Sequence, residues 1–137
     1  MSLLIFKEHL TSISEDIYFD EGEFLREKTT DPDRLLGLIR YGDGLLRKEN
    51  TSEEIYFLHG MLGNLYRIYG KPEKAIYHLE ESLKLAESEN NIKKQTASLI
   101  RLGEAQKYSG KREGALELFN KAYTKAVHEG AAEYIDF

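Results

Sequence analysis

Hydrophobic side chains recur every three or four residues in five separate windows of this sequence, and polar residues fill most positions between them. That spacing places the hydrophobic residues of each window on one face of an α-helix. It predicts helices over residues 32–48, 51–69, 72–88, 92–109 and 112–128. The positions expected to be buried are Leu35, Leu36, Ile39, Leu45 and Leu46; Ile55, Leu58, Leu62, Leu65 and Tyr69; Ile76, Leu79, Leu83 and Ala86; Leu99, Leu102 and Ala105; and Ala115, Leu116, Phe119, Ala122, Tyr123 and Ala126.

The residues between these windows are of the kinds that begin and end helices. Pro32 and Pro72 fit the first turn of a helix, where an amide proton is not needed. Thr51 and Glu54 have the S/T-x-x-E spacing of a capping box. Gly70 can adopt the left-handed conformation that ends a helix. The five windows are therefore expected to be separate helices joined by short turns.

One stretch, residues 62–86, recurs 40 positions downstream. A constant period of roughly 20 to 50 residues indicates an array of stacked structural units. The matching pairs are Leu62 and Leu102, Gly63 and Gly103, Gly70 and Gly110, Lys71 and Lys111, Glu73 and Glu113, Ala75 and Ala115, and Ala86 and Ala126.

Gly63 and Gly103 stand inside predicted helices, where a glycine costs about 1 kcal/mol relative to alanine. Gly63 and Ala75 lie on either side of one short turn, and Gly103 and Ala115 on either side of the next. Helices joined by such a turn pack as an antiparallel pair. Small residues at these positions predict a close approach between the two helices of each pair.

The period suggests one domain over residues 1–137. Residues 1–50 are expected to be a degenerate first repeat with an N-terminal helix, 51–90 and 91–130 two full repeats, and 131–137 the start of a truncated repeat or a cap. Residues 2–10 favour a short helix, and Ser12 with Glu15 has capping-box spacing. The hydrophobic run from Ile17 to Leu25 lacks helical periodicity. Either the natural chain continues beyond Phe137 or something covers the open end of the array.

Charge and composition narrow the possible functions. The net charge of -5 argues against nucleic-acid binding, which needs clustered cations. The absence of cysteine removes disulfides, thiolate metal sites and cysteine nucleophiles. Four histidines are scattered without metal-ligand spacing, and the glycines do not form a phosphate-binding loop. No metal, cofactor or enzymatic activity is expected. The four-residue apolar start is too short for a signal peptide or a membrane span, which favours a cytoplasmic protein without membrane contact.

The repeated residues resemble the tetratricopeptide repeat (TPR) family, whose first helix carries L-G-x-x-Y and whose second carries A-x-x-x-F-x-x-A. The spacing of 40 is similar to the longer variant in bacterial peptide-sensing regulators and kinesin light chains. The resemblance implies an all-α, right-handed superhelical α-solenoid of antiparallel helix hairpins. Ser82 stands where the family has alanine, and Gln106 where it has tyrosine. The residues that carry the resemblance are Leu62, Gly63, Tyr66, Gly70, Ala75 and Leu79, and Leu102, Gly103, Gly110, Ala115, Phe119 and Ala122.

In this family the first helix of each repeat lines the concave side of the superhelix. The resemblance therefore implies a peptide-binding groove. Asn64, Arg67 and Lys107 could hold a peptide backbone or a carboxylate there, which favours an acidic segment or a free C-terminus. The alternative is that these charges serve solubility. The residues placed in the groove are Phe57, Gly60, Asn64, Arg67 and Ile68, and Ala97, Ile100, Glu104, Lys107 and Tyr108.

Three functions are open at this point. The first is a non-catalytic module that binds a protein or peptide partner in the groove. The second is self-assembly as a homodimer, in which the open end of the array is covered. The uneven distribution of charge along the chain supports this second function, because an acidic segment of one copy could meet a basic segment of the other. Residues 1–33 carry three basic and nine acidic side chains, and residues 91–112 carry six basic and one acidic. The third is the sensor portion of a longer bacterial peptide-responsive regulator.

Overall fold

The computed structural model describes residues 4–5, 18–19, 25–26 and 32–129. Five helices run through the last of these ranges, and each begins and ends within two residues of its predicted limits. Of the predicted helix over residues 2–10, only Leu4 and Ile5 are described, and both are helical. The predicted cap at Ser12 and the segment 131–137 lie outside the described residues. The helices are α2 (Pro32–Leu46), α3 (Ser52–Tyr69), α4 (Pro72–Ser88), α5 (Ile92–Tyr108) and α6 (Arg112–Glu129).

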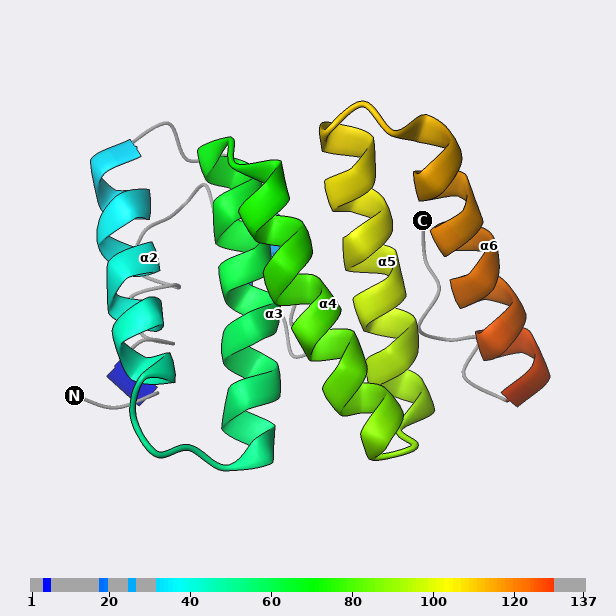
Figure 1. Ribbon diagram of the computed structural model, residues 1–137, viewed down its shortest axis with the longest axis horizontal. Helices are drawn as coiled ribbons and strands as arrows, with labels where there is room; N and C mark the ends of the chain where they lie inside the picture. The colour runs from blue at the N-terminus through cyan, green and yellow to red at the C-terminus, as the bar shows by residue number, and fades with distance from the viewer. Residues whose placement is uncertain (1–3, 6–17, 20–24, 27–31, 130–137) are drawn as a thin grey trace.

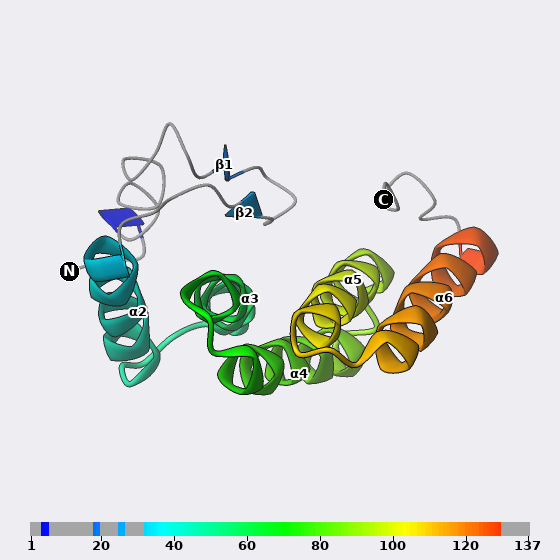
Figure 2. The ribbon, with the colours of Figure 1, turned by 90° about the horizontal axis from the view of Figure 1, so that it is seen from above.

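The helices stand side by side in chain order and form a helical repeat solenoid (Figure 1). Seen from above, they follow an arc, with α3 and α5 toward the inner side and α4 toward the outer side (Figure 2). Two short strands, β1 (Tyr18–Phe19) and β2 (Leu25–Arg26), pair in antiparallel register on the inner side of this arc. They fall in the run that lacks helical periodicity.

The predicted ends of α3 are confirmed by hydrogen bonds and a backbone angle, and the structure adds a cap at the start of α5. The Thr51 hydroxyl oxygen accepts from the Glu54 amide at 3.2 Å, and the Glu54 carboxylate accepts from the Thr51 amide at 2.8 Å, which completes the capping box. Gly70 ends α3 with a φ of 92°, in the left-handed region that favours glycine. Asn91 caps α5, because its side-chain oxygen accepts from the Lys94 amide at 3.0 Å.

The close approach predicted for the repeated glycines is present in both hairpins. A Cβ atom placed on Gly63 would lie 2.6 Å from Leu79 Cδ2 and still closer to Cγ. A Cβ on Gly103 would lie 2.5 Å from Phe119 Cε1. Leu79 and Phe119 are themselves 40 residues apart, so the same packing occurs twice. In each case the glycine makes room for a side chain of the partner helix.

The core follows the inward faces of the helices. Leu58, Leu62 and Leu65 on α3 are fully buried and pack with Ala75 and Leu79 of α4. A smaller cluster joins Leu99, Ile100 and Ala122 of α5 and α6.

Two predicted core residues are instead exposed. Leu116 is 61% exposed and Tyr123 is 56% exposed. Their face of α6 is the end of the array, and in the described part of the chain no further helix packs there (Figure 2). The prediction failed because helical periodicity identifies a hydrophobic face without showing what covers it.

Candidate protein-binding surface

The inner side of the arc is built mainly by α3 and α5, which are parallel to one another in adjacent hairpins (Figures 1 and 2). The turns at Gly70 and Gly110 end each hairpin's first helix at the same edge of the array. This arrangement places the predicted groove residues of α3 beside those of α5. The strand β2 also contacts α3.

The structure divides the predicted groove residues into two groups. Phe57, Asn64, Ala97 and Ile100 are buried, and so is Gly60. The second group lies toward the C-terminal ends of the two helices and reaches the surface. In it Arg67, Ile68 and Glu104 are half-buried, and Lys107 and Tyr108 are exposed.

Arg67 and Tyr108 are brought together at this exposed end. The guanidinium carbon of Arg67 lies 5.0 Å from the centre of the Tyr108 ring, which is a cation–π contact between α3 and α5. The Nε atom of Arg67 is buried and has no hydrogen-bond partner in the described part of the chain. Tyr108 is 55% exposed, so the pair reaches the surface of the array.

The other end of the inner side is held by an ion-pair network. Lys94 Nζ lies 2.7 Å from the carboxylate of Glu53 and 3.1 Å from that of Glu89, and it also lies 4.7 Å from the centre of the Tyr56 ring. These contacts join α5 to α3 and to the end of α4. The ammonium group of Lys94 is therefore already neutralised within the chain.

Sequence reasoning missed a buried arginine between these two ends. Arg101 is 1% exposed, and a Cβ on Gly60 would lie 2.9 Å from its Nη1 atom. The same Cβ would lie 3.9 Å from the hydroxyl oxygen of Ser82, which in turn is 3.4 Å from that of Ser98. Gly60 thus leaves space for the guanidinium group of Arg101, and the hydroxyl pair of Ser82 and Ser98 lies close by.

A model of the tetratricopeptide repeat family matches residues 54–126, which is more than half of the chain. The chain belongs to the tetratricopeptide repeat family. No curated protein and no solved structure matches it in the other two comparisons. TPR arrays generally mediate interactions between proteins and are typically non-catalytic. The matched region covers nearly all of α3, all of α4 and α5 and most of α6, and so includes the inner-side surface just described apart from Glu53 and β2.

The TPR hairpin also brings together two histidines that seemed scattered in the sequence. His59 Nδ1 on α3 lies 2.9 Å from His78 Nδ1 on α4, so one ring donates and the other accepts. The ring of His78 stacks on that of Tyr66, with 5.4 Å between centres. The antiparallel pairing that sets Gly63 of α3 against Leu79 of α4 also brings these two rings together, so the contact follows once the hairpin register is applied to both helices.

An acidic residue of α2 completes the cluster. The Tyr66 hydroxyl donates to Asp43 at 2.8 Å, and burial together with this hydrogen bond raises the pKa of Tyr66 to about 12. Burial, and next the nearby His59, lowers the pKa of His78 to about 4, against the opposing attraction of Asp43 and Glu81. Burial also lowers the pKa of His59. Both rings are therefore neutral at pH 7, and the cluster joins three helices.

The described residues contain no group of three or more His, Cys, Asp or Glu side chains arranged to hold a metal ion.

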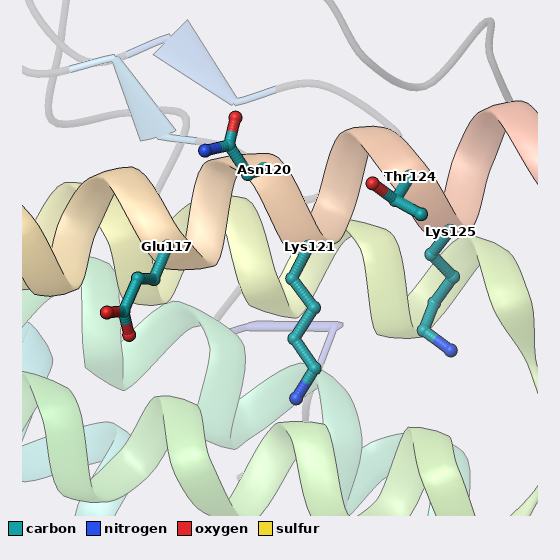
Figure 3. A pocket seen from close by; sticks show the side chains of 5 residues that line it. All are labelled: Glu117, Asn120, Lys121, Thr124 and Lys125. Atoms are coloured by element: carbon teal, nitrogen blue, oxygen red, sulfur yellow. The ribbon is translucent and has the colours of Figure 1, made fainter.

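A shallow, open hollow lies on α6, where Glu117, Lys121 and Lys125 project from one side and Asn120 and Thr124 from the other (Figure 3). None of these was predicted as a site residue. Among the described helices of this TPR array, none is long and apolar enough to cross a membrane.

Proposed function

We propose that this TPR chain is a non-catalytic module that binds a segment of a partner protein on the inner side of the arc. The observation that carries the proposal is the exposed pair of Arg67 and Tyr108 at the C-terminal ends of α3 and α5. An aromatic ring and a guanidinium group that span two adjacent repeats offer both apolar area and directed hydrogen bonds.

The chemistry of this end favours an acidic segment or a free C-terminus. A guanidinium group stacked on a ring keeps its edge available for a carboxylate. Lys107 is exposed on the same end of α5 and adds a second cation, and Glu104 is half-buried one turn earlier. The buried Nε–H of Arg67 has no acceptor among the described residues, and an unpaired donor of this kind costs about 1–3 kcal/mol. A partner carboxylate that drew Arg67 outward would remove that cost.

The buried group of predicted residues has a different part in the proposal. Phe57, Asn64 and Ile100 are each less than one tenth exposed in the folded chain. A partner segment therefore makes its first contact at the Arg67 end. In the proposal these three residues support the wall of the surface and do not touch the partner directly.

The proposal is tested by quantitative affinity capture with charge-reversed variants. The test variant carries Arg67→Glu and Lys107→Glu. The control carries Arg40→Glu and Lys48→Glu, which make the same charge change at exposed positions of α2 and the turn that follows it. We expect the test variant to lose partner recovery by about tenfold or more, and the control to keep it.

Captured partners are then reduced to overlapping peptides, and binding is measured by titration. Peptides with acidic side chains or a free C-terminal carboxylate should bind best, and amidation of the C-terminus should weaken the latter class. Recovery of the same partners in the same amounts by both double variants would show that the inner side is not the binding surface. A preference for neutral or basic peptides would contradict the proposed chemistry while leaving the surface itself in place.

A further inference from the structure

Residues on the concave faces of α3 and α5 are buried, although none of the five described helices lies across that side of the arc (Figure 2). Asn64 on α3 is 3% exposed, and Ala97 and Ile100 on α5 are each 7% exposed. Asn64 also has an interaction partner within the chain. These observations indicate that a part of the chain other than the helices contributes to the cover on this side.

The described elements that lie on the concave side are the strands β1 and β2. Phe19 of β1 pairs with Leu25 of β2 in antiparallel register, and β2 contacts α3. Figure 2 shows the pair inside the arc, next to α3. Burial follows this contact, because Asn64 of α3 is buried whereas Glu104, its equivalent 40 positions later on α5, is half-buried. The strand pair is therefore placed to cover the inner side.

The segment that contains both strands is acidic and rich in aromatic residues. Residues 15–27 carry six acidic side chains, one basic side chain and three aromatic rings. The opposite charge predominates on α5 and its flanking turns, since residues 91–112 carry six basic side chains and one acidic side chain. Acidic and aromatic groups are also the chemistry that the inner side favours in a partner. The chain thus contains a segment of the kind that its own inner side is suited to bind.

From these observations we propose that the acidic segment that carries β1 and β2 is an internal occupant of the inner-side surface, which a partner segment must displace to extend along α3 and α5. While the strand pair is in place, a partner reaches only the Arg67 end. A surface that is open for part of the time binds with an apparent affinity reduced by the open fraction. The displacement rests on the function proposed above, whereas the cover is tested without a partner.

Thiol labelling tests the cover, because the chain has no cysteine of its own. Asn64→Cys and Ala97→Cys each place one thiol on the concave side, and Thr124→Cys places one at an exposed position of α6. We expect a maleimide probe to label positions 64 and 97 at least about tenfold more slowly than position 124. Equal rates at the three positions would show that the concave side is open and would overturn the proposal.

Disrupting the strand pair should uncover these positions. Phe19→Pro with Leu25→Pro removes two amide donors and prevents regular pairing, and it should raise labelling at positions 64 and 97 by about tenfold or more. The matched control is Phe19→Val with Leu25→Val, which keeps good strand formers and should leave both rates unchanged. Ala86→Cys, at a fully buried position of α4, should stay slow in every background and so show that the helices remain packed.

Charge reversal within the segment gives a second test that does not depend on the strands. Asp20→Lys with Glu21→Lys removes the attraction to the basic surface and should also raise labelling at positions 64 and 97. A synthetic peptide of residues 15–27, added in excess to the proline variant, should slow the labelling again. Labelling rates that neither double variant raises would overturn the proposal.

Partner binding separates this inference from the proposed function. Where partner recovery depends on Arg67 and Lys107, the proline variant should bind the same partner about threefold or more tightly than the valine control, and the 15–27 peptide should compete with it. Equal binding by the proline and valine variants would overturn the displacement and leave the proposed function in place. Recovery that does not depend on Arg67 would overturn the proposed function and the displacement with it, while the labelling result for the cover would stand.

Discussion

The packing at Gly63 gives a quantitative prediction for Gly63→Ala. In an open helix position this change stabilises the folded chain by about 1 kcal/mol, because alanine is the better helix former. At Gly63 the new methyl group would lie 2.6 Å from Leu79 Cδ2. Carbon atoms in favourable contact are about 3.5–4.0 Å apart, so Leu79 must move by roughly 1 Å. Leu79 is fully buried and has little room to do so.

The expected loss follows from these two opposing effects. Forcing an extra methyl group into a packed core costs about 1–3 kcal/mol. The clash is at the branch point of Leu79, not at the tip of a flexible chain, which favours the upper half of that range. After the gain in helix propensity is subtracted, Gly63→Ala should lower the free energy of unfolding by about 1–2 kcal/mol.

Gly37→Ala is the matched control, because a Cβ on Gly37 of α2 would have no neighbouring atom within 4 Å. It should raise the free energy of unfolding by up to about 1 kcal/mol. The helix-propensity effect is common to both variants, so the difference between their unfolding free energies isolates the packing cost at Gly63. Urea titrations followed by far-UV circular dichroism and by tyrosine fluorescence measure both values.

A double-mutant cycle with Leu79→Ala identifies the clashing partner. Leu79→Ala alone should cost about 2–5 kcal/mol, since it leaves a cavity in the core. In that background Gly63→Ala should no longer destabilise, because the vacated space takes the methyl group. Equal stability of Gly63→Ala and Gly37→Ala would refute the packing argument. So would strictly additive effects in the cycle.

Two further predictions concern pH and helix capping. The pKa of His78 is about 4 in the folded chain and 6.5 in the unfolded chain, so the unfolded state binds the proton first and stability falls as pH drops from 6.5 toward 4. His78→Phe should reduce the difference in unfolding free energy between pH 7.5 and 5 by about 1 kcal/mol or more, which urea titrations at the two pH values measure. Thr51→Ala removes the cap of α3 and should cost about 1 kcal/mol in urea titration, against near-zero for Ser52→Ala; equal effects would contradict the capping role.

The sequence predicted the five helices closely, because each of its signals is local. Thr51, Pro72 and Gly70 act within a few residues of themselves, and their roles were confirmed by hydrogen bonds and backbone angles. The role of Gly63 required one more step, since it depends on a hairpin partner. The 40-residue period supplied that step by repeating the same pair of positions at Gly103.

The surfaces were harder to predict because they depend on what lies next to a residue in space. Leu116 has the spacing of a core residue and is exposed, while Phe57 and Ile100 were expected in an open groove and are buried. Helical periodicity shows which face of a single helix is the most hydrophobic. It carries no information on neighbours that come from another repeat, from the inner side of the arc or from another molecule.

The buried Arg101 shows most clearly the limit of predicting side-chain contacts from the repeat. The residue 40 positions earlier is Met61, which is also buried, so the period predicts an apolar side chain at that place. Arginine fits because Gly60 leaves space at its Nη1 atom. Ser82, which replaces the alanine found 40 positions later at Ala122, also lies close to Gly60. Three departures from the repeat therefore occur together, around Gly60. The residues that the two hairpins share therefore determine the array. The neighbouring positions at which the hairpins differ identify contacts that are specific to this chain.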